Sequence, residues 1–121
     1  MPDFTVLQWA TLFFTAAAVG GLTMGVMRFK GAPTPPVWLA VGHGLGAATG
    51  LVILVYACLM TDVPSQAKMA ATLFVLAALG GFTMAFGYHA RQLALPKGLL
   101  VAHAVTAATA LGLLILAWMP R

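Results

Sequence analysis

Four long apolar runs restrict what this chain can fold into more than any other feature of its sequence. They lie near residues 5–28, 37–60, 67–89 and 97–119. Each has about 20 or more residues, enough for a helix to cross a hydrocarbon core of about 30 Å. Inside lipid every backbone N–H and C=O group needs a partner within its own segment, so we expect helices and not strands. The sequence therefore predicts an all-α integral membrane protein that crosses the bilayer four times.

The composition of the chain agrees with a membrane environment. Hydrophobic residues make up 62% of the 121 residues and charged residues only 7%, whereas a soluble domain carries about 25% charged residues. The formal net charge of +4 comes from basic residues in the gaps between apolar runs, where such residues set membrane topology. We expect a lipid bilayer around this chain and no nucleic-acid partner.

The links between the apolar runs are short. Three prolines lie between Gly31 and Pro36, and Pro64 and Pro96 mark the second and third links. Pro36 and Pro96 suit the start of a helix, where a missing N–H costs nothing. Short links make sequential helices antiparallel neighbours, which predicts a four-helix bundle.

The basic residues predict an orientation in the membrane. Lys and Arg favour the first and third links over the opposite side by four to two. The four on the favoured side are Arg28, Lys30, Arg91 and Lys97. Because cytoplasmic links are enriched in Lys and Arg, we expect these links in the cytoplasm and both termini outside it, in a bacterial inner membrane.

The second half of the sequence repeats the first at an offset of 60 residues without a gap. The matched segments are Gly20-Gly21-Leu22-Thr23-Met24 with Gly80-Gly81-Phe82-Thr83-Met84, Pro36 with Pro96, and His43 with His103. These matches predict two tandem hairpin repeats, residues 1–61 and 62–121, within one structural domain. Each hairpin crosses the membrane twice, so both copies have the same orientation. We therefore expect a pseudo-twofold axis along the membrane normal to relate them.

His43 and His103 are the candidate functional residues. Each lies about two turns inside its apolar run, where an ionisable side chain is costly without a partner and indicates a functional site. A haem iron needs two axial ligands on opposite sides of its plane and apolar walls between facing helices. The sequence predicts one haem b between these two imidazoles, with both histidines as ligands of the iron.

Small and basic residues complete the predicted haem site. A niche of small residues next to the histidines leaves room for a flat ligand: Gly46, Ala47, Gly50 and Ala107. Small residues at such spacing also serve helix packing alone. The haem propionates are anionic, and the cations on the same side as the histidines are Arg28, Lys30, Arg91 and Lys97.

Three other interpretations of the histidines stay open. Each imidazole could simply bond a backbone carbonyl, or a hydroxyl such as Thr23 or Thr83. A chlorophyll-type pigment also accepts an imidazole ligand. Met24 and Met84 are paired in the repeat, and a site of two His and two Met would favour Cu(I).

The four-helix layout with His43 and His103 resembles the b-type cytochromes of membranes, including cytochrome b561-like proteins, whose bundles hold haem between helix histidines. The resemblance implies haem binding and electron transfer. It covers the layout and these two residues, and one pair of histidines excludes a second bis-histidine haem.

Three functions follow from these observations. The first is a haem b electron carrier or haem-bearing subunit of a respiratory or photosynthetic complex, with quinone as a possible membrane partner. The second is a cofactor-free accessory or assembly subunit, or a homo-oligomer, that binds neighbouring helices. The third is a small transporter. The two acidic residues, Asp3 and Asp62, lie at the ends of the apolar segments and not within a membrane helix, which disfavours this function. None of the three is a stand-alone enzyme, since no nucleophile with a base and no phosphate loop is present.

Overall fold

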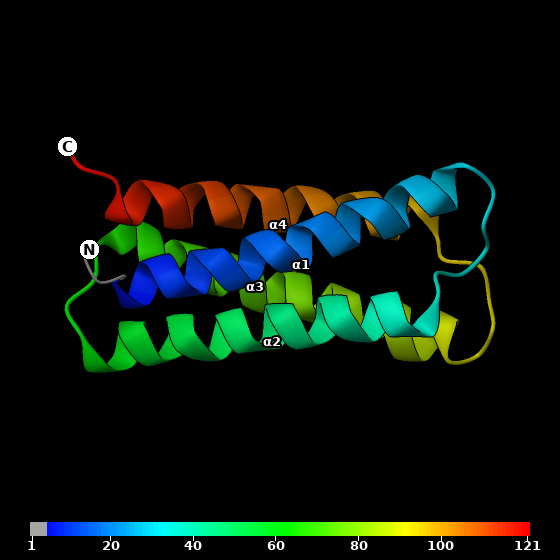
Figure 1. Cartoon of the computed structure of the whole chain (residues 1–121), viewed down its shortest axis with the longest axis horizontal. Coiled ribbons are helices and arrows are strands. Elements are labelled where there is room, and N and C mark those ends of the chain that lie inside the picture. Colours follow the sequence, from blue (N-terminus) through cyan, green and yellow to red (C-terminus); the bar gives the residue numbers. More distant parts are fainter. Residues whose placement is uncertain (1–4) are drawn as a thin grey trace.

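The computed structural model describes residues 5–121 and contains four long helices in that range. They are α1 (Val6–Phe29), α2 (Val37–Met60), α3 (Ser65–Met84) and α4 (Lys97–Trp118), and the π-helical turn η1 (Ala85–His89) continues α3. All four spans are long and apolar enough to cross a membrane (Figure 1). The prediction of an all-helical chain with four candidate spans is confirmed, and it is consistent with an integral membrane protein. The position of Asp3 lies outside the described residues.

Local sequence signals explain where the helices begin. Pro36 and Pro96 are the N-caps of α2 and α4, as the sequence predicts. Helix α1 begins with a capping box, in which Thr5 and Gln8 each bond the other's backbone N–H. Helix α3 starts at Ser65, directly after the N-cap Pro64, two residues earlier than the apolar run predicts. With η1 counted as the end of α3, the other observed boundaries lie within one residue of the predicted ones.

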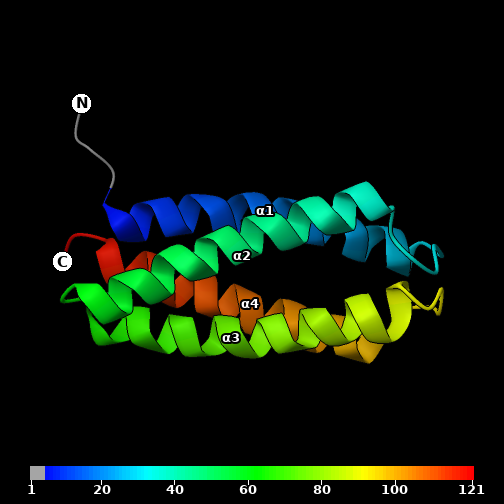
Figure 2. The same cartoon turned by 90° about the horizontal axis from the view of Figure 1, so that it is seen from below.

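The helices form an antiparallel bundle of two hairpins. Helix α1 packs along α2 and α3 packs along α4, while α1 also contacts α4 and α2 contacts α3. The link 61–64 and the C-terminus lie at one end of the bundle, and the links 30–36 and 90–96 lie together at the other (Figures 1 and 2). We call the second of these the basic end, because Arg28, Lys30, Arg91 and Lys97 are located there.

The hydrophobic core fills the half of the bundle away from the basic end. Phe14 and Phe74 stack within it, with ring centroids 3.6 Å apart and an interplanar angle of 1°. Leu54 and Leu114 are fully buried beside them. The other buried members are Leu7, Ala10, Ala57, Ala67, Ala70 and Ala110. The first buried residue of α2 is Gly50 and that of α4 is Ala110. The first half of each helix therefore contributes no buried residue to the core.

Equivalent residues of the two repeats occupy similar places in this core. Phe14 and Phe74 are separated by the repeat offset of 60 residues, and so are Leu54 and Leu114. Each member of these pairs is buried like its counterpart. The sequence repeat is therefore accompanied by a repeat in packing.

The basic end departs from the repeat. The turn η1 is a π-helix in which the N–H of Ala90 donates to the carbonyl of Ala85, whereas the equivalent part of α1 is α-helical. Gly31 takes a positive φ of 111° after α1, and Gln92 takes one of 56° after η1. The two positions differ by 61 residues rather than 60, since the wider π-turn uses one more residue. The sequence did not predict this turn.

Backbone strain at Gln92 gives a first test. A left-handed conformation costs a residue with a Cβ roughly 1 kcal/mol or more, and glycine adopts it freely. Gln92→Gly should therefore raise the free energy of unfolding by about 1 kcal/mol, measured as a higher midpoint of thermal unfolding in detergent. The matched control Gly31→Ala should lower the midpoint. A lower midpoint for Gln92→Gly would contradict the strained geometry.

Candidate functional site

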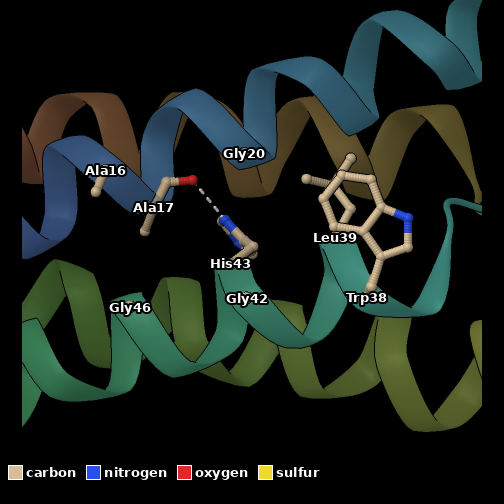
Figure 3. A pocket seen from close by; sticks show the side chains of 8 residues that line it. All are labelled: Ala16, Ala17, Gly20, Trp38, Leu39, Gly42, His43 and Gly46. Atoms are coloured by element: carbon tan, nitrogen blue, oxygen red, sulfur yellow. Dashed lines mark hydrogen bonds between the residues drawn. The ribbon is translucent and has the colours of Figure 1, made fainter.

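His43 and His103 make the same hydrogen bond in their two hairpins. The Nδ1 of His43 lies 2.7 Å from the carbonyl oxygen of Ala17 on α1 (Figure 3), and the Nδ1 of His103 lies 2.8 Å from that of Ala77 on α3. Ala17 and Ala77 are themselves separated by the repeat offset. Each imidazole is thus held by the other helix of its own hairpin.

This bond determines which ring nitrogen can bind a ligand. A carbonyl oxygen only accepts, so Nδ1 must carry the proton and the neutral ring keeps its lone pair on Nε2. Metal-binding histidines characteristically donate their other N–H to a carbonyl or carboxylate, which fixes the ring and increases its basicity. Each ring therefore has the second hydrogen bond that metal-binding histidines characteristically make.

The two imidazoles approach each other across the bundle. Their ring centroids are 6.1 Å apart with an interplanar angle of 71°. An imidazole nitrogen lies about 2 Å from a bound metal, so two rings that share one ion have centroids roughly 6 Å apart. Both side chains are half-buried. The spacing suits two ligands of a single metal ion.

The repeated glycine pair explains how the rings fit against α1 and α3. A Cβ on Gly21 would lie 2.9 Å from Cε1 of His43, and one on Gly81 would lie 3.4 Å from Cε1 of His103. A Cβ on Gly20 or Gly80 would lie 3.6 Å or 3.9 Å from the Cβ of the same histidine, which is ordinary contact. Gly21 therefore provides space that the His43 ring occupies, and the second hairpin has more room at the same place.

The predicted niche residues divide into two groups. A Cβ on Gly46 would meet Ala17 of α1 at 3.5 Å, and one on Gly50 would meet the ring of Phe14 at 3.1 Å. These two glycines face α1, so their small size serves packing inside the hairpin. Ala47 and Ala107 are half-buried on the helices that carry the histidines, one turn beyond each of them.

A cavity of about 200 Å³ opens beside His43 between α1 and α2. Figure 3 shows His43 within it and the side chains of Trp38 and Leu39 at one side. It is lined by Ala16, Ala17, Gly20, Trp38, Leu39, Gly42, His43 and Gly46. The second hairpin has Leu76 and Thr106 at the positions of Ala16 and Gly46, so this part of the repeat is unequal.

Two of the predicted propionate residues, Arg28 and Lys97, make contacts at the basic end of the bundle. Arg28 follows Ala17 by eleven residues, about 16 Å along α1, and its Nε donates to the carbonyl of Leu95 at 2.9 Å. The Nζ of Lys97 lies 5.4 Å from the centroid of the Phe29 ring. Both contacts direct these side chains toward the end of the bundle. Lys30 and Arg91 are exposed there as well.

The other residues considered from the sequence are also placed. Thr23 and Thr83 bond the carbonyls of Val19 and Leu79 in their own helices, so they are not the histidines' partners. Met84 is buried and Met24 half-buried, and a copper site that includes them stays a prediction. His89 lies in η1 at the basic end.

The sequence left open a bond from each imidazole to a backbone carbonyl, and the structure identifies the acceptors as Ala17 and Ala77, which the sequence did not predict. A backbone acceptor leaves no side-chain signal, although both alanines precede the repeated Gly-Gly by three residues. Sequence reasoning also missed the Phe14–Phe74 stack. The offset of 60 could have shown that pair, because both residues are phenylalanine.

Comparison of the chain with known protein families, with curated proteins and with solved structures gives no match.

The unequal space beside Gly21 and Gly81 provides a test of how the histidine rings pack. Gly21→Ala forces the His43 ring to move, and we expect it to lower the free energy of unfolding by about 1–2 kcal/mol. Gly81→Ala is the matched control in the second repeat, where the contact is looser. It should lower the free energy of unfolding by less. Thermal unfolding in detergent measures both. Equal losses, or a larger loss for Gly81→Ala, would contradict this packing.

Proposed function

We propose that the protein is a small membrane haem b protein that transfers electrons, with one haem held between His43 and His103. The observation that supports it most is the matched pair of imidazoles, each with Nδ1 bonded to a carbonyl and Nε2 available. Their separation of 6.1 Å agrees with two rings on one iron.

The surroundings of the pair suit a porphyrin in two respects. The histidines lie in the half of the bundle where α2 and α4 bury no residue, so a flat apolar group gains contacts there that the core does not already use. The neighbouring side chains are apolar or absent, including Ala17, Ala77, Gly21 and Gly81. Haem binding would then stabilise this half of the bundle.

The proposal includes a pseudo-twofold axis along the membrane normal between the two hairpins. It is supported by side chains that meet their own counterparts: Phe14 meets Phe74, and His43 approaches His103. A ligand on such an axis receives the same contact from each repeat. Duplication of one hairpin would in this way produce two axial ligands from one ancestral histidine.

The chain's own residues account for the type of chemistry. A haem supplies a one-electron couple when it is bound. With His43 and His103 on its two faces, both axial positions are taken, which favours electron transfer over oxygen chemistry. The carbonyls of Ala17 and Ala77 hold the rings and tune their basicity. The side chains of Arg28 and Lys97 are turned toward the end of the bundle. We therefore do not propose them as partners of the haem propionates.

The proposed setting is a bacterial inner membrane with the basic end in the cytoplasm. The outer surface of the helices is apolar along its length, with exposed side chains such as Leu22, Val52, Leu79 and Leu116. A quinone or the helices of a larger complex would reach the haem through this surface.

A cofactor-free accessory subunit is the second candidate. The carbonyl bonds of His43 and His103 favour it, because they already give each imidazole one partner without a metal. In that case the pair would serve packing alone, and the purified protein would be colourless.

The absorption spectrum of protein purified from haem-replete cells separates the two candidates. We expect a Soret band and sharp α and β bands after reduction. His43→Ala and His103→Ala should each abolish the reduced bis-histidine spectrum, because either change removes an axial ligand. His89→Ala is the matched control and should leave it unchanged.

Two results would contradict the haem proposal. One is a colourless preparation from cells in which a control cytochrome is fully loaded. The other is a wild-type spectrum that persists in both histidine variants.

A further inference from the structure

Two cations from different hairpins meet where the end of α1 approaches the start of α4. The Nε of Arg28 donates to the carbonyl of Leu95, two residues before Lys97. The Nζ of Lys97 lies over the ring of Phe29, the residue after Arg28. The N–H of Leu95 in turn donates to the carbonyl of Pro33, at 3.1 Å. These contacts tie links 30–36 and 90–96 together and fix both cations at one junction.

No acidic residue compensates these charges in the part of the chain that the structure describes. Among residues 5–121 the acid is Asp62, and it lies in the link at the opposite end of the bundle. Lys30 and Arg91 add positive charge at the basic end. A cation without a counter-ion attracts an anion, so an anion at the junction would be stabilised.

The junction lies at the depth of lipid headgroups when the helices span a bilayer. The 24 residues of α1 extend about 36 Å, and the hydrocarbon core is about 30 Å thick. Arg28 and Lys97 are therefore near the level of the phosphates. Leu22, Val26 and Phe29 are exposed on one face of α1, and the first two lie deeper in the bilayer than Arg28.

We propose that the Arg28–Lys97 junction binds the phosphate of an anionic phospholipid. The guanidinium of Arg28 uses Nε for Leu95 and keeps both Nη groups, which suit paired hydrogen bonds to phosphate oxygens. The ammonium of Lys97 supplies the second charge. The exposed apolar face of α1 receives the acyl chain, which is why the occupant is a lipid and not a free phosphate ion.

Lipid binding to the purified full-length protein in detergent tests this site. The probe is phosphatidylglycerol, counted as bound lipid by native mass spectrometry, with phosphatidylcholine and inorganic phosphate as the other arms. We expect phosphatidylglycerol to bind more tightly than phosphatidylcholine and inorganic phosphate to leave its binding unchanged. Displacement by millimolar phosphate would show that the junction takes the free ion, and would overturn the lipid assignment.

Charge variants separate this junction from the general charge of the basic end. A hydrogen bond to a charged group is worth about a tenfold change in affinity or more, so Lys97→Gln should weaken phosphatidylglycerol binding roughly tenfold. The double variant Arg28→Gln/Lys97→Gln should weaken it by roughly 100-fold. The matched control Lys30→Gln/Arg91→Gln also removes two charges from this end, and it should have a clearly smaller effect.

The loss of the Arg28–Leu95 bond could unfold the double variant. In that case Lys97→Gln alone tests the proposal. Lys97 is exposed and its described side-chain contact is with the Phe29 ring, so the substitution should leave the fold intact. Unchanged binding in Lys97→Gln, or an equal loss in Lys30→Gln/Arg91→Gln, would overturn the proposal.

Discussion

The hydrogen bond from each imidazole to a backbone carbonyl of the neighbouring helix is the interaction on which the rest of this structure depends. An ionisable ring inside an apolar bundle is costly unless it has a partner, and the bonds to Ala17 and Ala77 supply one. Because a carbonyl can only accept, the bond also sets the tautomer and directs the lone pair to Nε2. The glycine at position 21 is a consequence, since a Cβ there would lie 2.9 Å from Cε1 of His43, whereas at Gly81 the corresponding contact would be an ordinary 3.4 Å.

Different interactions hold together the two halves of the bundle. Phe14, Phe74, Leu54 and Leu114 close the half away from the basic end, where aromatic stacking and buried leucines hold the two hairpins together. The other half is held by the histidine bonds and by the contacts of Arg28 and Leu95 between the two links. The sequence repeat supplies the phenylalanine, the leucine and the histidine twice, which explains how so short a chain brings like side chains together. The π-turn η1 and the cavity beside His43 are features in which the two halves differ.

Much of the architecture could be predicted from the sequence because lipid leaves few choices. Runs of apolar residues, proline N-caps at Pro36 and Pro96, and the offset of 60 are all one-dimensional signals. The pairing of the two histidines could be predicted because they match at this offset. The carbonyls that bond them could not be predicted, since a carbonyl such as that of Ala17 has no side-chain signature. The π-turn after Met84 has no sequence signature either, and the positions of Arg28 and Lys97 depend on how two links meet. Gly46 and Gly50 illustrate a further limit: a small residue shows that something approaches closely, but only the coordinates show that it is α1.

The central claim, that His43 and His103 share one haem iron, is tested most directly by the electron paramagnetic resonance spectrum of the oxidised protein. Two axial imidazoles with planes far from parallel, as the angle of 71° implies, give a strongly anisotropic low-spin ferric signal. The account predicts that signal at one iron per chain. A high-spin ferric signal, or a preparation from haem-replete cells without haem iron, would contradict it.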